Sequence, residues 1–189
     1  MKFYTGIGSR KTPQPILDMF ERMGEWAVKK GYCLRSGHAD GADSAFERGC
    51  DKLAGPKEIY IPWKGFNGST SHLYLENLNK RPDAFSLASE CNPLLYGSKE
   101  ATRKLHTRNV YQVLGQDIQT PSIFIVCFTP NGEEKGGTAT AIRIGKRYNI
   151  PIFNAGYYYT NGIFDEAKCV DDFNEFINKI ENSDKMVFP

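Results

Sequence analysis

The sequence lacks three features that would each have indicated a class of protein. No two of its five cysteines share a C-x-x-C or cysteine–histidine spacing, which argues against a zinc site or a disulfide framework. We interpret them as buried free thiols in a reducing compartment. No apolar run approaches the ~20 residues that a membrane span needs. The formal net charge of +2 is too small to indicate a general nucleic-acid coat.

Targeting and cofactor signals are also missing. No secretory signal pattern follows Met1, because Lys2 and Phe3 run directly into a strand-like segment. We therefore expect a cytoplasmic protein with no membrane partner. Neither a metal nor a cofactor is predicted, since no ligand spacing typical of a metal site occurs.

Strand-like runs alternate with segments whose apolar residues recur at helical spacing. The 189 residues suit one domain spanning 1–189. The alternation predicts the α/β class, with a Rossmann-like, doubly wound, mainly parallel sheet covered by helices on both faces. The expected strands are residues 2–7, 32–35, 57–62, 123–129 and 150–154, and the expected helices occupy about 12–30, 42–53, 99–114, 139–148 and 170–180.

Residues from about 63 to 117 break this regularity, with glycines and prolines scattered through them. We interpret them as an irregular elaboration on the same domain that covers the ligand site, because neither flank has the composition of a linker. The segment ends in a basic helix at 99–114. Beside Lys64, the rings of Trp63 and Phe66 could stack a nucleic-acid base, or could pack in the core or a lid.

Three glycine-rich turns each follow an expected strand, at the sheet edge where parallel α/β folds bind ligands. Glycine lets the backbone approach a phosphate, and the first N–H groups of the following helix are unpaired and positively polarised. The candidate ligand-binding residues are Gly6, Gly8, Ser9 and Arg10 in the first turn, Ser36, Gly37, Ala39, Gly41 and Asp43 in the second, Gly136, Gly137 and Thr138 in the third, and Arg108 and Asn109 in the basic helix.

Other interpretations of these residues stay open. A single G-x-G turn also occurs as a plain connection, and Asp43 could simply complement the dipole of its helix. No catalytic residue is assigned. Asp43, Glu133 and Glu134 are the candidate acids or bases, although solvation of the loop explains the two glutamates better. His38 is interpreted as a surface residue or a hydrogen-bonded spacer rather than a catalyst.

Four of these motifs, taken in order, resemble those of the SLOG superfamily of Rossmann-like proteins, which includes the DprA (Smf), LOG and YpsA-related proteins. The resemblance is closest to the DprA-like Rossmann domain and covers roughly residues 3–154. The matching segments are Gly8-Ser9-Arg10, Ser36 to Asp43, His106-Thr107-Arg108-Asn109 and Gly137-Thr138. The resemblance implies a Rossmann-like fold, a phosphate-bearing ligand and a homo-oligomer.

The chain departs from the LOG enzymes at one position that matters for catalysis. Those enzymes cleave the N-glycosidic bond of nucleoside monophosphates with a P-G-G-x-G-T-x-x-E motif, and Ala141 stands where that glutamate would be. The resemblance therefore favours a sensor or sequestering protein that binds a nucleotide or nucleotide-derived signalling molecule. The alternatives are an N-glycosidic hydrolase or transferase that uses Glu133 or Glu134, and a DprA-like protein that binds single-stranded DNA.

Overall fold

The computed structural model describes residues 1–185 and confirms the α/β class, with a central five-stranded sheet in which every pairing is parallel. The strand order is β3-β2-β1-β4-β5, so the order reverses between β1 and β4. Open α/β sheets bind ligands beyond the carboxyl ends of their strands at such a reversal. The strands are β1 (Lys2–Gly8), β2 (Tyr32–Ser36), β3 (Lys57–Ile59), β4 (Phe124–Phe128) and β5 (Ile152–Asn154).

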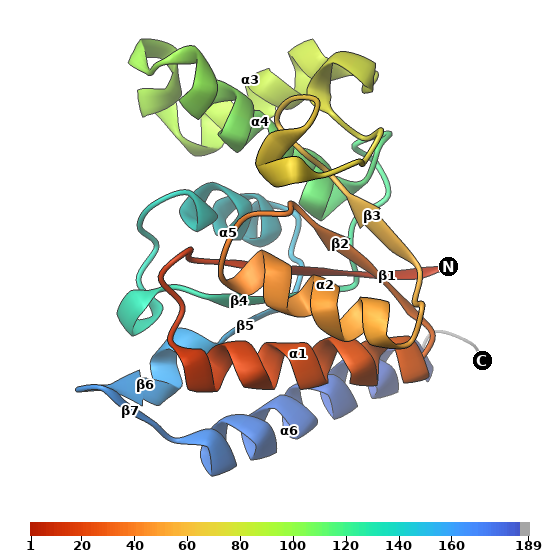
Figure 1. Cartoon of the computed structure of the whole chain (residues 1–189), viewed down its shortest axis with the longest axis vertical. Coiled ribbons are helices and arrows are strands. Elements are labelled where there is room, and N and C mark those ends of the chain that lie inside the picture. The colour runs from red at the N-terminus through yellow and green to blue at the C-terminus, as the bar shows by residue number, and fades with distance from the viewer. Residues whose placement is uncertain (186–189) are drawn as a thin grey trace.

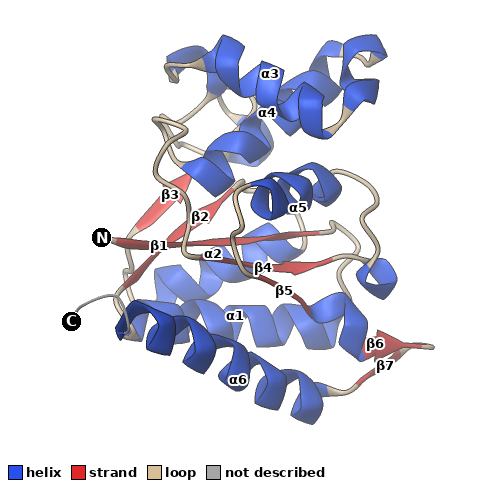
Figure 2. Ribbon diagram, turned by 180° about the vertical axis from the view of Figure 1, so that it is seen from behind, coloured by secondary structure: helices blue, strands red, loops and turns tan. Residues whose placement is uncertain are grey.

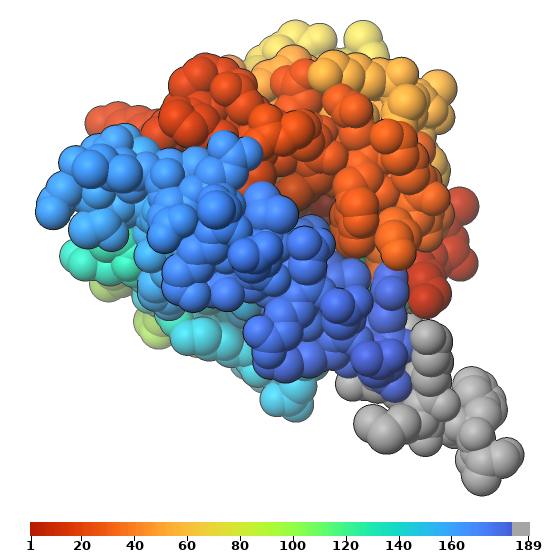
Figure 3. All heavy atoms as spheres, turned by 90° about the horizontal axis from the view of Figure 1, so that it is seen from below, coloured from red at the N-terminus to blue at the C-terminus, as the bar shows by residue number. Residues whose placement is uncertain are grey.

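Helices cover both faces of the sheet (Figure 1, Figure 2), which confirms the doubly wound arrangement. One face carries α1, α2 and α6, with α1 between α2 and α6 (Figure 1), and Figure 3 shows the blue C-terminal part of the chain packed against the red and orange N-terminal part. The other face carries α4 and α5, with α3 packed on the outer side of α4. The bounds are α1 (Gln14–Lys29), α2 (Ala42–Lys52), α3 (Arg81–Cys91), α4 (Glu100–Leu114), α5 (Thr138–Arg147) and α6 (Glu166–Lys185).

Helices α1 and α2 approach one another closely because each presents a glycine where they meet. A Cβ added at Gly49 would lie 1.9 Å from the carbonyl oxygen of Glu21, and one at Gly24 would lie 2.7 Å from the carbonyl oxygen of Phe46. Beside this contact the rings of Phe20 and Phe46 stack with centroids 4.3 Å apart. The contact holds α2, and with it the turn before α2, in a fixed position against the sheet.

Among the element boundaries that differ from the sequence prediction, two have identifiable reasons. The third strand ends at Ile59 rather than at residue 62, because Ile61 donates its N–H to the carbonyl oxygen of Leu73 (3.0 Å) and leaves the sheet. The last helix begins at residue 166 rather than 170, because the Asp165 carboxylate accepts the N–H of Lys168 (3.1 Å) and caps it.

Some elements were not predicted at all. Residues 63–117 contain α3 and three short 3₁₀ turns in addition to the expected α4. Strands β6 (Tyr159–Thr160) and β7 (Ile163–Phe164) form an antiparallel hairpin that projects from the domain (Figure 2). Among residues 1–185, no helix combines the length and the apolar character that crossing a membrane requires.

Candidate functional site

A cavity of about 530 Å³ opens at the carboxyl ends of β1 and β4, where the strand order reverses. Its volume falls within the range of small-molecule sites, about 300–1,000 Å³. All three predicted turns contribute to its wall. The predicted residues that line it are Gly8, Ser9, Arg10, Ala39, Asp43, Arg108, Asn109, Gly136, Gly137 and Thr138.

Four predicted ligand residues do not line the cavity, and three of them, Gly6, Ser36 and Gly41, hold the turns in place. Gly6 faces α2, where a Cβ would lie 2.6 Å from Cγ of Phe46. Ser36 is fully buried and donates its hydroxyl to the carbonyl oxygen of Gly6 (2.7 Å). Gly41 has a φ of +81°, and a Cβ there would lie 2.5 Å from the carbonyl oxygen of Ser9. These residues serve close packing between β1, β2 and α2.

Arg108 brings a buried positive charge to the cavity wall. It is 6% exposed, and its Nη1 donates to the carbonyl oxygen of Gly37 (2.6 Å) and lies 3.9 Å from Oδ2 of Asp43. Burial lowers the pKa of Arg108, and the Asp43 carboxylate partly offsets that effect. Gly37 does not line the cavity, and a Cβ there would lie 1.7 Å from Nη1 of Arg108. Gly37 is therefore a positioning residue for the guanidinium.

Asp43 is the only carboxylate among the described residues that line the cavity. It lies in the first turn of α2, is 2% exposed, and accepts the N–H of Gly8 at 3.1 Å. Burial raises the pKa of Asp43 to about 6, and the nearby Arg108 only partly offsets this. The side chain thus ties the second turn to the first, and its carboxyl group can exchange a proton near neutral pH.

The third turn presents open backbone to the cavity. Helix α5 begins at Thr138, and no side chain caps its N-terminus. Asn109 holds the turn by donating Nδ2 to the carbonyl oxygen of Gly137 (2.8 Å). Gly136 has a φ of +71°, and a Cβ at Gly136 or Gly137 would meet no atom within 4 Å. A positively polarised helix terminus with accessible backbone favours an anion.

Permanent positive charge outweighs negative charge around the cavity. Asp43 is the one carboxylate, and the lining cations are Arg10, Lys11, Arg108 and Lys135. The side chains of Arg10 and Lys11 form no hydrogen bond or ion pair with any part of the chain that the structure describes. Two of the four cations are therefore available to a ligand without breaking an internal contact.

The candidate glutamates and the position of the LOG glutamate lie away from the cavity. Glu133 pairs with Nζ of Lys135 at 2.5 Å, and Glu134 pairs with Lys146. Ala141 is fully buried in the hydrophobic cluster that α4 and α5 form with the sheet. No glutamate is among the described residues that line the cavity.

Eight further residues line the cavity that the sequence motifs did not mark as ligand contacts: Ile7, Lys11, Leu105, His106, Gln112, Thr129, Pro130 and Lys135. Leu105 and Gln112 lie three residues before and four after Arg108, so all three share one face of α4. The helical spacing around Arg108 of the Arg108-Asn109 motif could have predicted these two residues from the sequence. Nδ1 of His106 lies 2.7 Å from the Thr140 hydroxyl, and burial lowers the pKa of this histidine.

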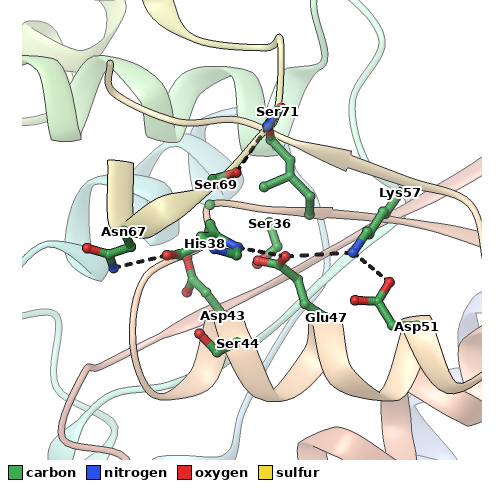
Figure 4. A network of polar contacts seen from close by, with 12 residues as sticks. Ser36, His38, Asp43, Ser44, Glu47, Asp51, Lys57, Asn67, Ser69 and Ser71 are labelled. Atoms are coloured by element: carbon green, nitrogen blue, oxygen red, sulfur yellow. Dashed lines mark hydrogen bonds and ion pairs between the residues drawn. The ribbon is translucent and has the colours of Figure 1, made fainter. Parts of the chain in front are cut away.

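Polar contacts around His38 fasten the second turn to α2 and to the loop beyond β3 (Figure 4). Nδ1 of His38 lies 2.9 Å from Oε2 of Glu47, and its carbonyl oxygen accepts Nδ2 of Asn67 at 3.1 Å. Nζ of Lys57 lies 3.9 Å from Oε2 of Glu47 and 2.6 Å from Oδ1 of Asp51. These contacts agree with the interpretation of His38 as a hydrogen-bonded spacer.

Trp63 and Phe66 do not line the cavity, so they do not provide the stacking surface for a base there. Their rings meet edge to face with centroids 5.2 Å apart, and Phe66 is buried in the hydrophobic cluster on the α1–α2 face. Of the alternatives stated for these rings, packing is the one observed.

Neither metal-ligand geometry nor comparison with known proteins adds to this description. Within residues 1–185, no three or more histidine, cysteine, aspartate or glutamate side chains are grouped so as to hold a metal ion. A scan against protein-family models, a search of curated proteins and a search of solved structures each found no match to this chain.

Proposed function

We propose that this chain binds a phosphate-bearing nucleotide, or a signalling molecule derived from one, in the cavity at the carboxyl ends of β1 and β4. The observation that carries the proposal is the cavity's charge: four permanent cations and one buried carboxylate surround it. A phosphate at the uncapped start of α5 would meet polarised N–H groups and the free side chains of Arg10 and Lys11.

The volume and the polar wall support a ligand larger than inorganic phosphate. The cavity, at about 530 Å³, has room for a sugar and a base beside the phosphate. Gln112 of α4 also lines the cavity, and its buried Nε2 has no hydrogen-bond partner within the described residues, so it can donate to such a ligand. The order of the glycine motifs, which resembles that of the SLOG superfamily, supports the same ligand class.

A thermal-shift screen over nucleoside mono-, di- and cyclic phosphates tests the proposal. A ligand at 100 times its dissociation constant adds about 2.7 kcal/mol to the free energy of unfolding, which raises the melting temperature measurably. Failure of every nucleotide in the panel to shift the transition would contradict the proposal.

A pair of variants assigns any binding to the cavity. Arg10→Ala combined with Lys11→Ala removes the two free cations and is expected to raise the dissociation constant by tenfold or more. Arg22→Ala combined with Lys30→Ala removes the same charge from exposed ion pairs on α1 and at its C-terminus, and is expected to leave the affinity unchanged. If both double variants lost the same affinity, nucleotide binding would depend only on the net charge of the protein.

A second candidate function is hydrolysis of the N-glycosidic bond of a nucleoside monophosphate. It is favoured by Asp43, a cavity carboxyl group whose pKa of about 6 suits proton transfer near neutral pH. Water would add across the bond between ribose C1′ and the base nitrogen, giving ribose 5-phosphate and free base. Chromatography of reactions with a nucleoside monophosphate panel tests it. Release of base that Asp43→Asn abolishes would replace the binding-only proposal.

A further inference from the structure

A second pocket lies between α3 and α4, inside the elaboration whose role the sequence did not indicate. Its volume is about 430 Å³, again within the range of small-molecule sites. The walls come from Leu75, from the first turns of α3 and from the amino-terminal half of α4. We name it the α3–α4 pocket.

The α3–α4 pocket is separate from the cavity at the sheet edge, although both use α4. Glu100, Arg103, Lys104 and Thr107 of this helix line the pocket. A different set of α4 residues lines the cavity: Leu105, His106, Arg108, Asn109 and Gln112. No residue lines both, so a ligand in one need not touch the other.

Two arginines of the pocket, Arg81 and Arg103, make no direct contact with an acidic side chain, although the charge of Arg81 helps to lower the pKa of Glu76. The guanidinium groups of Arg81 and Arg103 form no hydrogen bond or ion pair with any side chain that the structure describes. Lys104 differs, because its Nζ lies 2.9 Å from Glu76 and 3.2 Å from Glu100. The lysine charge is thus compensated within the protein, whereas the planar donor groups of the arginines remain available for a phosphate or carboxylate.

Three residues that line the pocket are apolar. They are the buried Leu75, Pro82 and the half-buried Phe85, and together they form the apolar wall. Tyr96, which is 65% exposed, meets Phe85 edge to face with ring centroids 5.8 Å apart and extends the aromatic surface. A flat apolar body would be partly desolvated against this wall while its anionic group faced the arginines.

We propose that the α3–α4 pocket is a second ligand site, for a small amphipathic anion with a planar apolar body and a phosphate or carboxylate group. The free arginine pair recognises the anionic group and the Phe85 wall recognises the ring. Neither the arginine pair nor the Phe85 wall belongs to the proposed nucleotide site, so each of the two proposals can be contradicted without the other.

The test titrates the full chain with phenyl phosphate, benzoate, inorganic phosphate and benzyl alcohol, and follows backbone amide chemical shifts by NMR. Phenyl phosphate or benzoate is expected to shift the amides of residues 83–86 and 100–107, and to bind at least ten times more tightly than inorganic phosphate or benzyl alcohol. The stronger of the two probes identifies the anionic group as phosphate or carboxylate.

Variants then assign the site. Arg81→Ala combined with Arg103→Ala is expected to weaken binding tenfold or more, and Phe85→Leu to weaken the aromatic probes without changing the affinity for inorganic phosphate. Arg22→Ala combined with Lys30→Ala is the charge-matched control and leaves the shifts intact. Heteronuclear spectra of each variant show that it is folded.

Three results would overturn the proposal. Shifts confined to residues 8–11 and 136–138 would place the probes in the sheet-edge cavity. Equal affinity for inorganic phosphate and phenyl phosphate would mean that the aromatic wall does not contribute to binding. If a single-stranded oligonucleotide bound more tightly than phenyl phosphate and benzoate, with a steep salt dependence, the surface would be a nucleic-acid contact rather than a small-molecule site.

Discussion

Residues 1–62 and residues 63–117 bury their side chains in different ways. In the first region α1 and α2 each bury a regularly spaced apolar face and meet at glycines in backbone contact. In the second, α3 has almost no apolar stripe, and the 3₁₀ turn that follows leaves Leu94 84% exposed. The sheet-edge cavity therefore rests on helices with broad apolar faces, whereas the α3–α4 pocket lies beside a helix that buries mostly small side chains.

The largest expected effect compares two phenylalanines. Phe46→Ala removes a fully buried ring that stacks on Phe20, and is expected to lower the free energy of unfolding by about 3–5 kcal/mol. Phe85→Ala, at a half-buried ring of the elaboration, is expected to cost about 1 kcal/mol. Urea denaturation of both variants measures the difference. Equal losses would mean that the elaboration is packed as tightly as the sheet frame.

The next effect compares two aspartates across pH. The pKa of Asp43 is raised by burial from 3.8 to about 6, so between these values the folded state holds a proton that the unfolded chain releases. Wild type is therefore expected to lose about 2–3 kcal/mol of stability relative to Asp43→Asn as the pH rises from 3.5 to 7. Denaturation series at several pH values check this.

Asp117, at the end of the elaboration, is expected to show the opposite sign. The Gln119 N–H and the Thr120 hydroxyl stabilise its carboxylate and lower the pKa of Asp117. Its contribution to stability is therefore present above the unfolded pKa near 4 and is lost as the pH falls below it. The free energy of unfolding of wild type is therefore expected to increase relative to that of Asp117→Asn as the pH rises through this window. The same sign for both aspartates would contradict the buried character of Asp43.

The smallest effect compares two glycines. A Cβ at Gly49 would meet the Glu21 carbonyl oxygen at 1.9 Å, so Gly49→Ala is expected to destabilise by about 2 kcal/mol despite the better helix propensity of alanine. A Cβ at Gly97 would meet no atom within 4 Å, so Gly97→Ala is expected to stay within about 0.5 kcal/mol of wild type. Thermal unfolding of the pair measures the contrast, and a neutral Gly49→Ala would show that α1 and α2 can move apart.

Local patterns predicted the sheet better than the elaboration. Apolar strand-like runs located all five strands of the sheet, and the helical spacing of Ile16, Phe20 and Met23 located α1. The same criterion failed for α3, whose buried residues are mostly small: Ala84, Leu87, Ala88 and Ser89. A helix that packs through small residues on a neighbour carries little periodic signal of its own.

The glycine motifs predicted the neighbourhood of the candidate site but not the role of every residue in it. The sequence predicted the same role for Gly8 and Gly37, as glycines of ligand-binding turns. In the structure Gly8 lines the cavity, whereas Gly37 makes room for Arg108. Glu134 lies in the same loop as Gly136 but pairs with Lys146 outside the cavity. Such differences depend on where a side chain points after the turn, which spacing alone does not specify.

Nucleotide or single-stranded DNA binding, the SLOG relationship, the cytoplasmic location and the homo-oligomer stay predictions. They rest on motif order and composition. The double variant of Arg10 and Lys11 addresses the first of them most directly, because it removes charge from the cavity without entering the core.

The sequence by itself determined the α/β class, the three glycine turns and their positions after strands, because hydrophobic period and glycine placement are local signals. Only the tertiary structure decided that β4 lies beside β1, which brings turns distant in the chain to one cavity. It also decided that Arg108 and Asp43 are buried together and that α3 forms a second pocket on α4. These are long-range contacts, and they depend on how the elements pack rather than on any one segment.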